Sequence, residues 1–123
     1  MAGVTQVLTQ EQFPCVPGNC PWSVFDVAGP ASYTVITTGS PPTGGQAISC
    51  STMGLPVSVI FATTSMVSDN GQYRAVPILS PFNAGAGSLT GIILQWIVAA
   101  TGAEVTAATD LSSRTVRILA IGR

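Results

Sequence analysis

The stretch from residue 56 to 79 most constrains the fold, because two runs of strand-forming residues flank Asp69-Asn70-Gly71. Asn-Gly between such runs is a strong short-range signal for a β-hairpin, since both residues tolerate a positive φ. The register stays open. A two-residue turn would place Val67 opposite Arg74, and a three-residue loop would place Val67 opposite Tyr73. Either register predicts a hairpin at the centre of the chain.

Short segments rich in β-branched residues, separated by Gly/Pro-rich turns, fill much of the remaining chain. We predict strands over residues 22–27, 31–38, 46–51, 88–102, 103–109 and 113–121. The segment 88–102 also matches helical spacing, but its β-branched and aromatic residues and an internal Gly91 favour a strand covered on both faces. Roughly eight or nine short strands predict an all-β, antiparallel fold, which is a β-sandwich, a jelly roll or a small barrel.

The domain organisation is simple. Residues 15–123 are expected to form a single β-domain. Residues 1–14 form a Thr/Gln/Val-rich N-terminal arm, either an edge strand or an extension that reaches a neighbouring subunit.

The last predicted strand, 113–121, has clearly alternating side chains. One face is apolar throughout, whereas the other begins polar with Arg117 and becomes apolar at Leu119 and Ile121. On an isolated sandwich Leu119 and Ile121 would be exposed, so we predict that a partner subunit covers them. The alternative is that the loop 80–88 covers them.

The low charge of the chain also points to association. Only 7% of the residues are charged, against about 25% in typical soluble domains. Such a surface is poorly defended against self-association, which predicts a homo-oligomer, although a monomer with a Thr/Ser-rich surface is the alternative. The residues expected at subunit contacts are Val4, Val7, Leu8, Phe13, Arg117, Leu119, Ile121 and Arg123.

The residue inventory argues against catalysis. The chain has no Lys and no His, which excludes imidazole general-base catalysis, Schiff-base chemistry and His-ligated metal sites. The five acidic residues each lie beside a turn or near a strand end, where a solvated carboxylate is usual, although a glycosidase-type pair is formally open. We therefore predict a non-enzymatic protein without catalytic, cofactor-binding or metal-binding residues.

The cysteines and the N-terminus bear on the compartment. Cys15 and Cys20 could close a small disulfide loop under oxidising conditions, and Cys50 is expected to be a small buried hydrophobe. The N-terminus lacks the pattern of a signal peptide, and the longest apolar run is far shorter than the ~18 residues of a membrane span. We therefore expect synthesis in a cytoplasm, free thiols and no membrane partner. A net charge of −1 predicts no nucleic-acid partner.

Taken as a whole, the chain resembles the small capsid decoration, or cement, proteins of tailed bacteriophages. The shared features are the arm from Met1 to Phe13, a Gly/Thr/Ala-rich β-domain, long Pro/Gly loops and almost no charge. The resemblance spans the whole chain and is one of type. It implies a virion structural protein, commonly a trimer at three-fold positions, that braces neighbouring subunits of the major capsid protein.

The alternative function is a carbohydrate- or receptor-binding module, such as a fibre tip or an adhesin. Trp22, Tyr33, Tyr73 and Trp96 could provide a sugar-stacking platform, provided that they are exposed beside polar loop residues. Aromatic residues on strands are more often part of a core, however, and three of these four lie in strands predicted to be buried.

Overall fold

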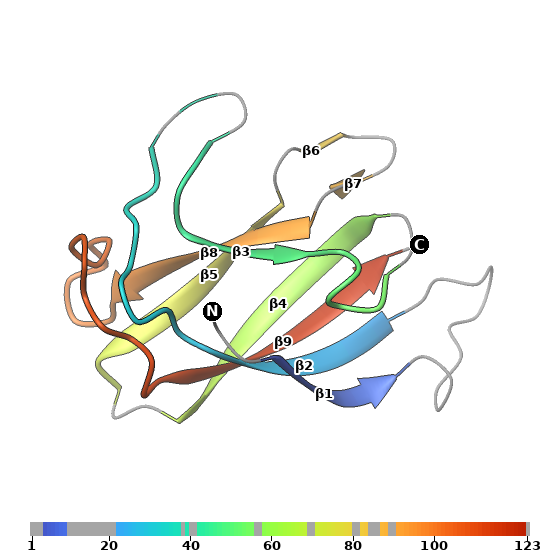
Figure 1. Ribbon diagram of the computed structural model, residues 1–123, viewed down its shortest axis with the longest axis horizontal. Coiled ribbons are helices and arrows are strands. Elements are labelled where there is room, and N and C mark those ends of the chain that lie inside the picture. Colours follow the sequence, from blue (N-terminus) through green and yellow to red (C-terminus); the bar gives the residue numbers. More distant parts are fainter. Residues whose placement is uncertain are drawn as a thin grey trace.

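The computed structural model has an all-β architecture, with no helix among the residues that it describes (Figure 1). The described residues are 4–9, 22–37, 39, 42–55, 58–68, 71–79, 82–83, 87–88 and 91–122. Their strands are β1 (Val4–Thr9), β2 (Trp22–Ala28), β3 (Gln46–Ser49), β4 (Val59–Ser68), β5 (Tyr73–Leu79), β6 (Phe82–Asn83), β7 (Gly87–Ser88), β8 (Gly91–Val98) and β9 (Thr115–Gly122).

The strands form two antiparallel sheets. The larger has the order β1-β2-β9-β4-β7-β6, and the smaller has the order β3-β8-β5. The prediction of an all-β antiparallel fold is confirmed. Its finer part, eight or nine short strands in a sandwich, jelly roll or barrel, is not shown, because β6 and β7 have two residues each and the described strands divide into sheets of six and three.

The prediction of a central hairpin is wrong. The two long strands that flank Asp69-Asn70-Gly71 are β4 and β5, which belong to different sheets: β4 pairs with β9 and β5 pairs with β8. Neither expected partner of Val67 is therefore a ladder partner. Each strand forms a long ladder elsewhere, and the chain passes between the sheets through Gly71, which has a φ of 78°. Asp69 and Asn70 lie outside the described residues.

The hydrophobic core lies between the sheets and uses the predicted alternation. The inward faces of β2 and β9 contribute residues such as Phe25, Val27 and Ile118, each at most 2% exposed. The smaller sheet contributes Leu94 and Trp96 from β8. Residues 91–98 form a strand, as expected, and the four from Gly91 to Leu94 are buried. Burial of Trp96 is the kind of tertiary contact that decides a strand over a helix in an ambiguous apolar segment.

Two predicted strands are absent. Within residues 31–37 the only bridge among the described residues is that of Thr37 with Thr43, and the Tyr33 N–H donates to the loop residue Thr109 at its carbonyl oxygen, over 3.0 Å. Residues 103–109 contribute an isolated bridge between Glu104 and Ile97. In each segment one large side chain, Tyr33 or Val105, is buried in the core, and the segment does not extend a ladder, which is the context dependence expected of β-propensity.

Candidate functional site

The outward side of the larger sheet carries rows of apolar side chains that cross three neighbouring strands. In one row Trp22 of β2 pairs with Ile121 of β9, and Ile121 pairs with Phe61 of β4. In the next row Val24 pairs with Leu119. The alternate residues of β2 and β9 are buried, so these five point outward. We call Trp22, Val24, Phe61, Leu119 and Ile121 the apolar outer face.

Exposure is greatest on β4, where the ladder is irregular. The register between β4 and β9 shifts between Val59 and Phe61 and again between Met66 and Ser68. The residues that the ladder skips are Ile60 and Val67, which are 43% and 50% exposed. Phe61 is 51% exposed. β-Bulges re-aim side chains and are frequent beside functional sites. Here they bring Ile60 to the solvent next to Phe61, and Val67 to the solvent at the opposite end of β4, beyond the residue that pairs with Arg117.

An ion pair borders the apolar outer face in the next row. Arg117 of β9 donates from Nε to Asp26 Oδ1 over 2.7 Å and from Nη2 to Asp26 Oδ2 over 2.9 Å. Asp26 and Arg117 are paired in the β2–β9 ladder, so the two-pronged contact follows from the register. The hydrogen bond from Arg117 lowers the pKa of the Asp26 carboxyl below its ordinary value. The pair neutralises two charges within the sheet surface.

The residues predicted to lie at subunit contacts fall into three groups. Arg117, Leu119 and Ile121 lie together on the outward side of β9, where Leu119 and Ile121 are half-buried. Val4, Val7 and Leu8 lie on β1, which is the edge strand of the larger sheet and pairs with β2. Phe13 and Arg123, and both cysteines of the expected disulfide, Cys15 and Cys20, lie outside the described residues, as does most of the loop 80–88 that was the alternative cover.

Sequence reasoning missed three members of the apolar outer face, which are Trp22, Val24 and Phe61. Ser23, Phe25 and Val27 of β2 are buried, which leaves Trp22 and Val24 on the outward side of the predicted strand. What the sequence lacks is a sign that β2 and β4 both pair with β9, because that register joins segments far apart in the chain.

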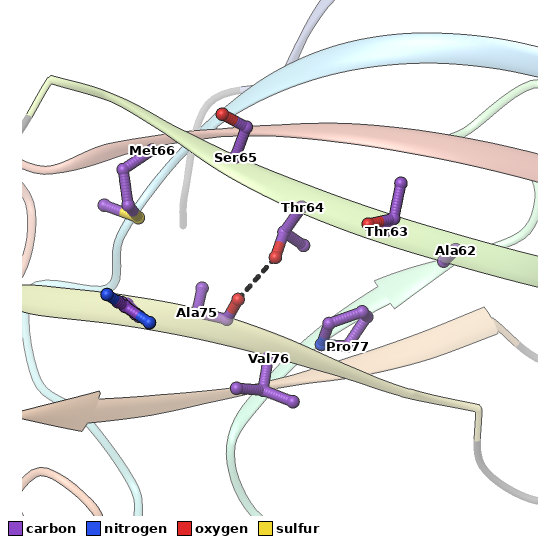
Figure 2. Close-up of a pocket in the computed structure, with 9 residues that line it drawn as sticks. Ala62, Thr63, Thr64, Ser65, Met66, Ala75, Val76 and Pro77 are labelled. Atoms are coloured by element: carbon purple, nitrogen blue, oxygen red, sulfur yellow. Dashed lines mark hydrogen bonds between the residues drawn. The ribbon is translucent and has the colours of Figure 1, made fainter. Parts of the chain in front are cut away.

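A second surface feature is a groove of about 570 Å³ between β4 and β5. Figure 2 shows its two walls, with Thr64 of β4 facing Ala75 of β5 across a hydrogen bond from Thr64 Oγ1 to Ala75 O of 2.6 Å. The lining residues are Ala62, Thr63, Thr64, Ser65, Met66, Arg74, Ala75, Val76 and Pro77. The groove is the seam where the two sheets meet without sharing a ladder.

The described carboxylates accept hydrogen bonds from other groups of the same chain. Glu104 Oε2 accepts hydrogen bonds of 2.8 Å from the Tyr33 hydroxyl and from the Ile36 N–H. Asp110 Oδ1 accepts from the N–H and the hydroxyl of Ser112. In the part of the chain that the structure describes, no cluster of three or more His, Cys, Asp or Glu side chains could hold a metal ion. Among the same residues there is also no helix long and apolar enough to cross a membrane.

Comparisons of the chain with protein-family models, with curated proteins and with solved structures found no match. The two surfaces described above consist of outward apolar side chains on the larger sheet and of the seam between β4 and β5.

Proposed function

We propose that this protein is a non-enzymatic structural protein that works by association, and that its fold is best regarded as a β-sandwich. The observation that carries the proposal is the apolar outer face, in which Trp22, Ile121 and Phe61 form one row across three strands. Contiguous exposed apolar surface in a soluble domain usually marks an interaction site. The predicted contact residues Leu119 and Ile121 belong to this same surface.

The assembly that we propose is a capsid shell, which the protein decorates and stabilises as a virion component. This step rests on the resemblance to the decoration proteins of tailed bacteriophages and on the low charge of the chain. Three copies related by a three-fold axis would cover their apolar outer faces against one another or against the major capsid protein. The remaining surface would then carry few charges, Arg74 and Asp110 among them, beside exposed Thr and Ser residues.

A carbohydrate-binding role has weaker support. Tyr33 and Trp96 are 1% and 0% exposed, so neither ring can stack on a sugar. Tyr73 is half-buried, and the Arg114 guanidinium lies 5.3 Å from its ring centre. Trp22 is half-buried and belongs to the apolar outer face, where an apolar partner suits it better than a sugar.

The test is the mass of the purified protein by light scattering across a dilution series, for the unaltered chain and for Phe61→Ser. Burying a whole Phe side chain is worth about 1.5–3 kcal/mol, so covering the exposed half of Phe61 should contribute about 1 kcal/mol, or roughly fivefold in each contact. We expect a trimer for the unaltered chain and weaker association for Phe61→Ser.

The matched control is Val76→Ser, which removes an exposed apolar side chain from the smaller sheet. This variant should keep the oligomer. A monomer at micromolar concentration for the unaltered chain, or an equal effect of both substitutions, would contradict association through the apolar outer face. Binding of the purified protein to isolated capsid shells then tests the virion role separately.

A further inference from the structure

The groove between β4 and β5 has the features of a site for an extended peptide. On the β4 side, the strand pairs with β9 along one edge, and on the other edge only Val59 of the described residues pairs, with Ser88 of β7. On the β5 side, the strand is the last one of the smaller sheet. Two strand edges therefore face the same groove, and such edges are templates for an added strand.

The hydrogen-bond pattern of β8 shows which backbone groups of β5 point into the groove. Trp96 donates its N–H to the Tyr33 hydroxyl over 3.2 Å and accepts at its C=O from the Val105 N–H over 2.9 Å. Trp96 therefore directs its backbone groups away from its ladder partner Ala75. Because such pairs alternate in an antiparallel ladder, Ala75 and Pro77 direct their backbone groups away from β8.

Two observations agree with this orientation. Ala75 O accepts the hydrogen bond from Thr64 that crosses the groove. Pro77 has no N–H, and at this position its ring removes no bond of the β5–β8 ladder, as expected for a proline on an edge strand. Of the β5 groups that point away from β8, the Ala75 N–H and the Pro77 C=O therefore line the groove, whereas the Ala75 C=O is already bonded to Thr64.

A cation on the groove wall indicates the chemistry of the occupant. Arg74 lines the groove, is exposed and has no ion-pair or hydrogen-bond partner among the described residues. Arg117 is held by Asp26, and Arg114 donates to Gln72 Oε1 over 2.6 Å. Apolar contacts beside Arg74 are supplied by Val76, which is 39% exposed. An extended segment that carries a carboxylate would complement this wall.

A second copy of this chain suits the groove less well than a different protein. The described carboxylates Asp26, Glu104 and Asp110 already accept hydrogen bonds within their own chain. An edge-to-edge pairing of two β5 strands that is centred on Arg74 would also place two like charges opposite each other, which is unfavourable.

We propose that the β4–β5 groove binds an extended acidic segment of another protein, with an Asp or Glu side chain of that segment against Arg74. Strand β5 has seven residues, and at about 3.3 Å per residue the segment would need roughly six to eight residues to span it. The proposal does not rest on the capsid role, since it concerns a different surface and is tested on the purified protein.

The test selects binders from a displayed library of random peptides of about eight residues and measures their affinity by fluorescence anisotropy. We expect selected peptides to carry Asp or Glu at one fixed position among β-branched residues. The Arg74→Gln substitution should lower the affinity for these peptides at least tenfold. The matched control Arg114→Gln, which removes a paired arginine, should leave that affinity within twofold. N-methylation of alternate peptide nitrogens should abolish binding only at the positions that face a strand edge.

Several outcomes would overturn the proposal. One is a selection that enriches no acidic peptides over the starting library. Another is an unchanged peptide affinity of the Arg74→Gln variant. The Arg74 side chain is exposed, so this substitution leaves the core intact. A third is a fall in the solution mass of Arg74→Gln, which would make the groove a contact between copies of this chain. Circular dichroism of each variant verifies that it is folded.

Discussion

At the scale of single residues, Tyr33 connects a segment without strand structure to the smaller sheet. Its hydroxyl donates to Glu104 Oε2 over 2.8 Å and accepts from the Trp96 N–H over 3.2 Å. The ring is 1% exposed, so removal of the hydroxyl would leave a buried donor and a part-buried acceptor without this partner. Burial, reinforced by the hydrogen bond to Glu104, raises the pKa of Tyr33 to about 12.

The Tyr33→Phe variant should therefore be less stable than the unaltered chain at neutral pH, by about 1–3 kcal/mol. Because the pKa of Tyr33 rises from 10.0 to about 12 on folding, the folded state holds the proton more tightly. The stability of the unaltered chain should then fall as the pH rises from 10.0 toward about 12, and part of this fall should be missing in Tyr33→Phe. Urea unfolding at neutral pH and at a series of alkaline pH values measures both effects.

The control for this substitution is Tyr73→Phe, which removes the same hydroxyl from a half-buried ring. It should change the stability at neutral pH less. Burial also raises the pKa of the Cys50 thiol, but that thiol is common to all three proteins and cancels in the comparison. An alkaline profile of Tyr33→Phe that matches the unaltered chain would contradict the structural role given to this hydroxyl.

At the scale of strands, Gly91 fixes the close approach of β8 to β3. Its φ of 143° is unfavourable for other residues, and a Cβ at this position would collide with the carbonyl oxygen of Ile48. Gly91 is the ladder partner of Ser49, so the collision lies within the β3–β8 pairing itself. The backbone of β3 cannot move aside as a flexible side chain could.

Gly91→Ala should accordingly destabilise the protein more than Gly102→Ala. Gly102 also has a positive φ, of 74°, but a Cβ there would meet no atom within 4 Å. We expect about 1–2 kcal/mol for the unfavourable backbone conformation at Gly102 and a further 1–3 kcal/mol, roughly, for the collision at Gly91. Thermal and urea unfolding of both variants measure the difference. Equal effects would mean that β3 yields without loss of its pairing.

The strands themselves differ in how far the sequence determines them. Strands β2 and β9 were predictable because alternation of their side chains matches a sheet with one buried face, as the burial of Phe25 and Ile118 confirms. The pairing of β4 with β9 and of β5 with β8 was not, because a local turn signal at Asn70-Gly71 cannot tell a hairpin from a connection between two sheets. For the same reason, the sequence predicted only two members of the apolar outer face, Leu119 and Ile121.

At the scale of the whole molecule, the proposed association should respond to solution conditions as an apolar contact does. The apolar outer face contains no charged residue, and the adjacent Asp26 and Arg117 already neutralise each other. Exposed charges are screened at about 1 M salt, where the Debye length is about 3 Å, but apolar burial is not. The dissociation constant should thus change by less than about threefold between low and high sodium chloride.

Temperature and sulfate further distinguish an apolar contact from a charged one. Hydrophobic stabilisation weakens on cooling and strengthens in sulfate. Light scattering or sedimentation of a dilution series should show weaker association in the cold and tighter association when sodium sulfate replaces sodium chloride. The matched variant is Asp26→Asn, which leaves Arg117 without its carboxylate and should make association more sensitive to salt. An oligomer of the unaltered chain that dissociates in sodium chloride and is unaffected by cooling would instead be held by charges, which would place its contacts away from Phe61 and Ile121.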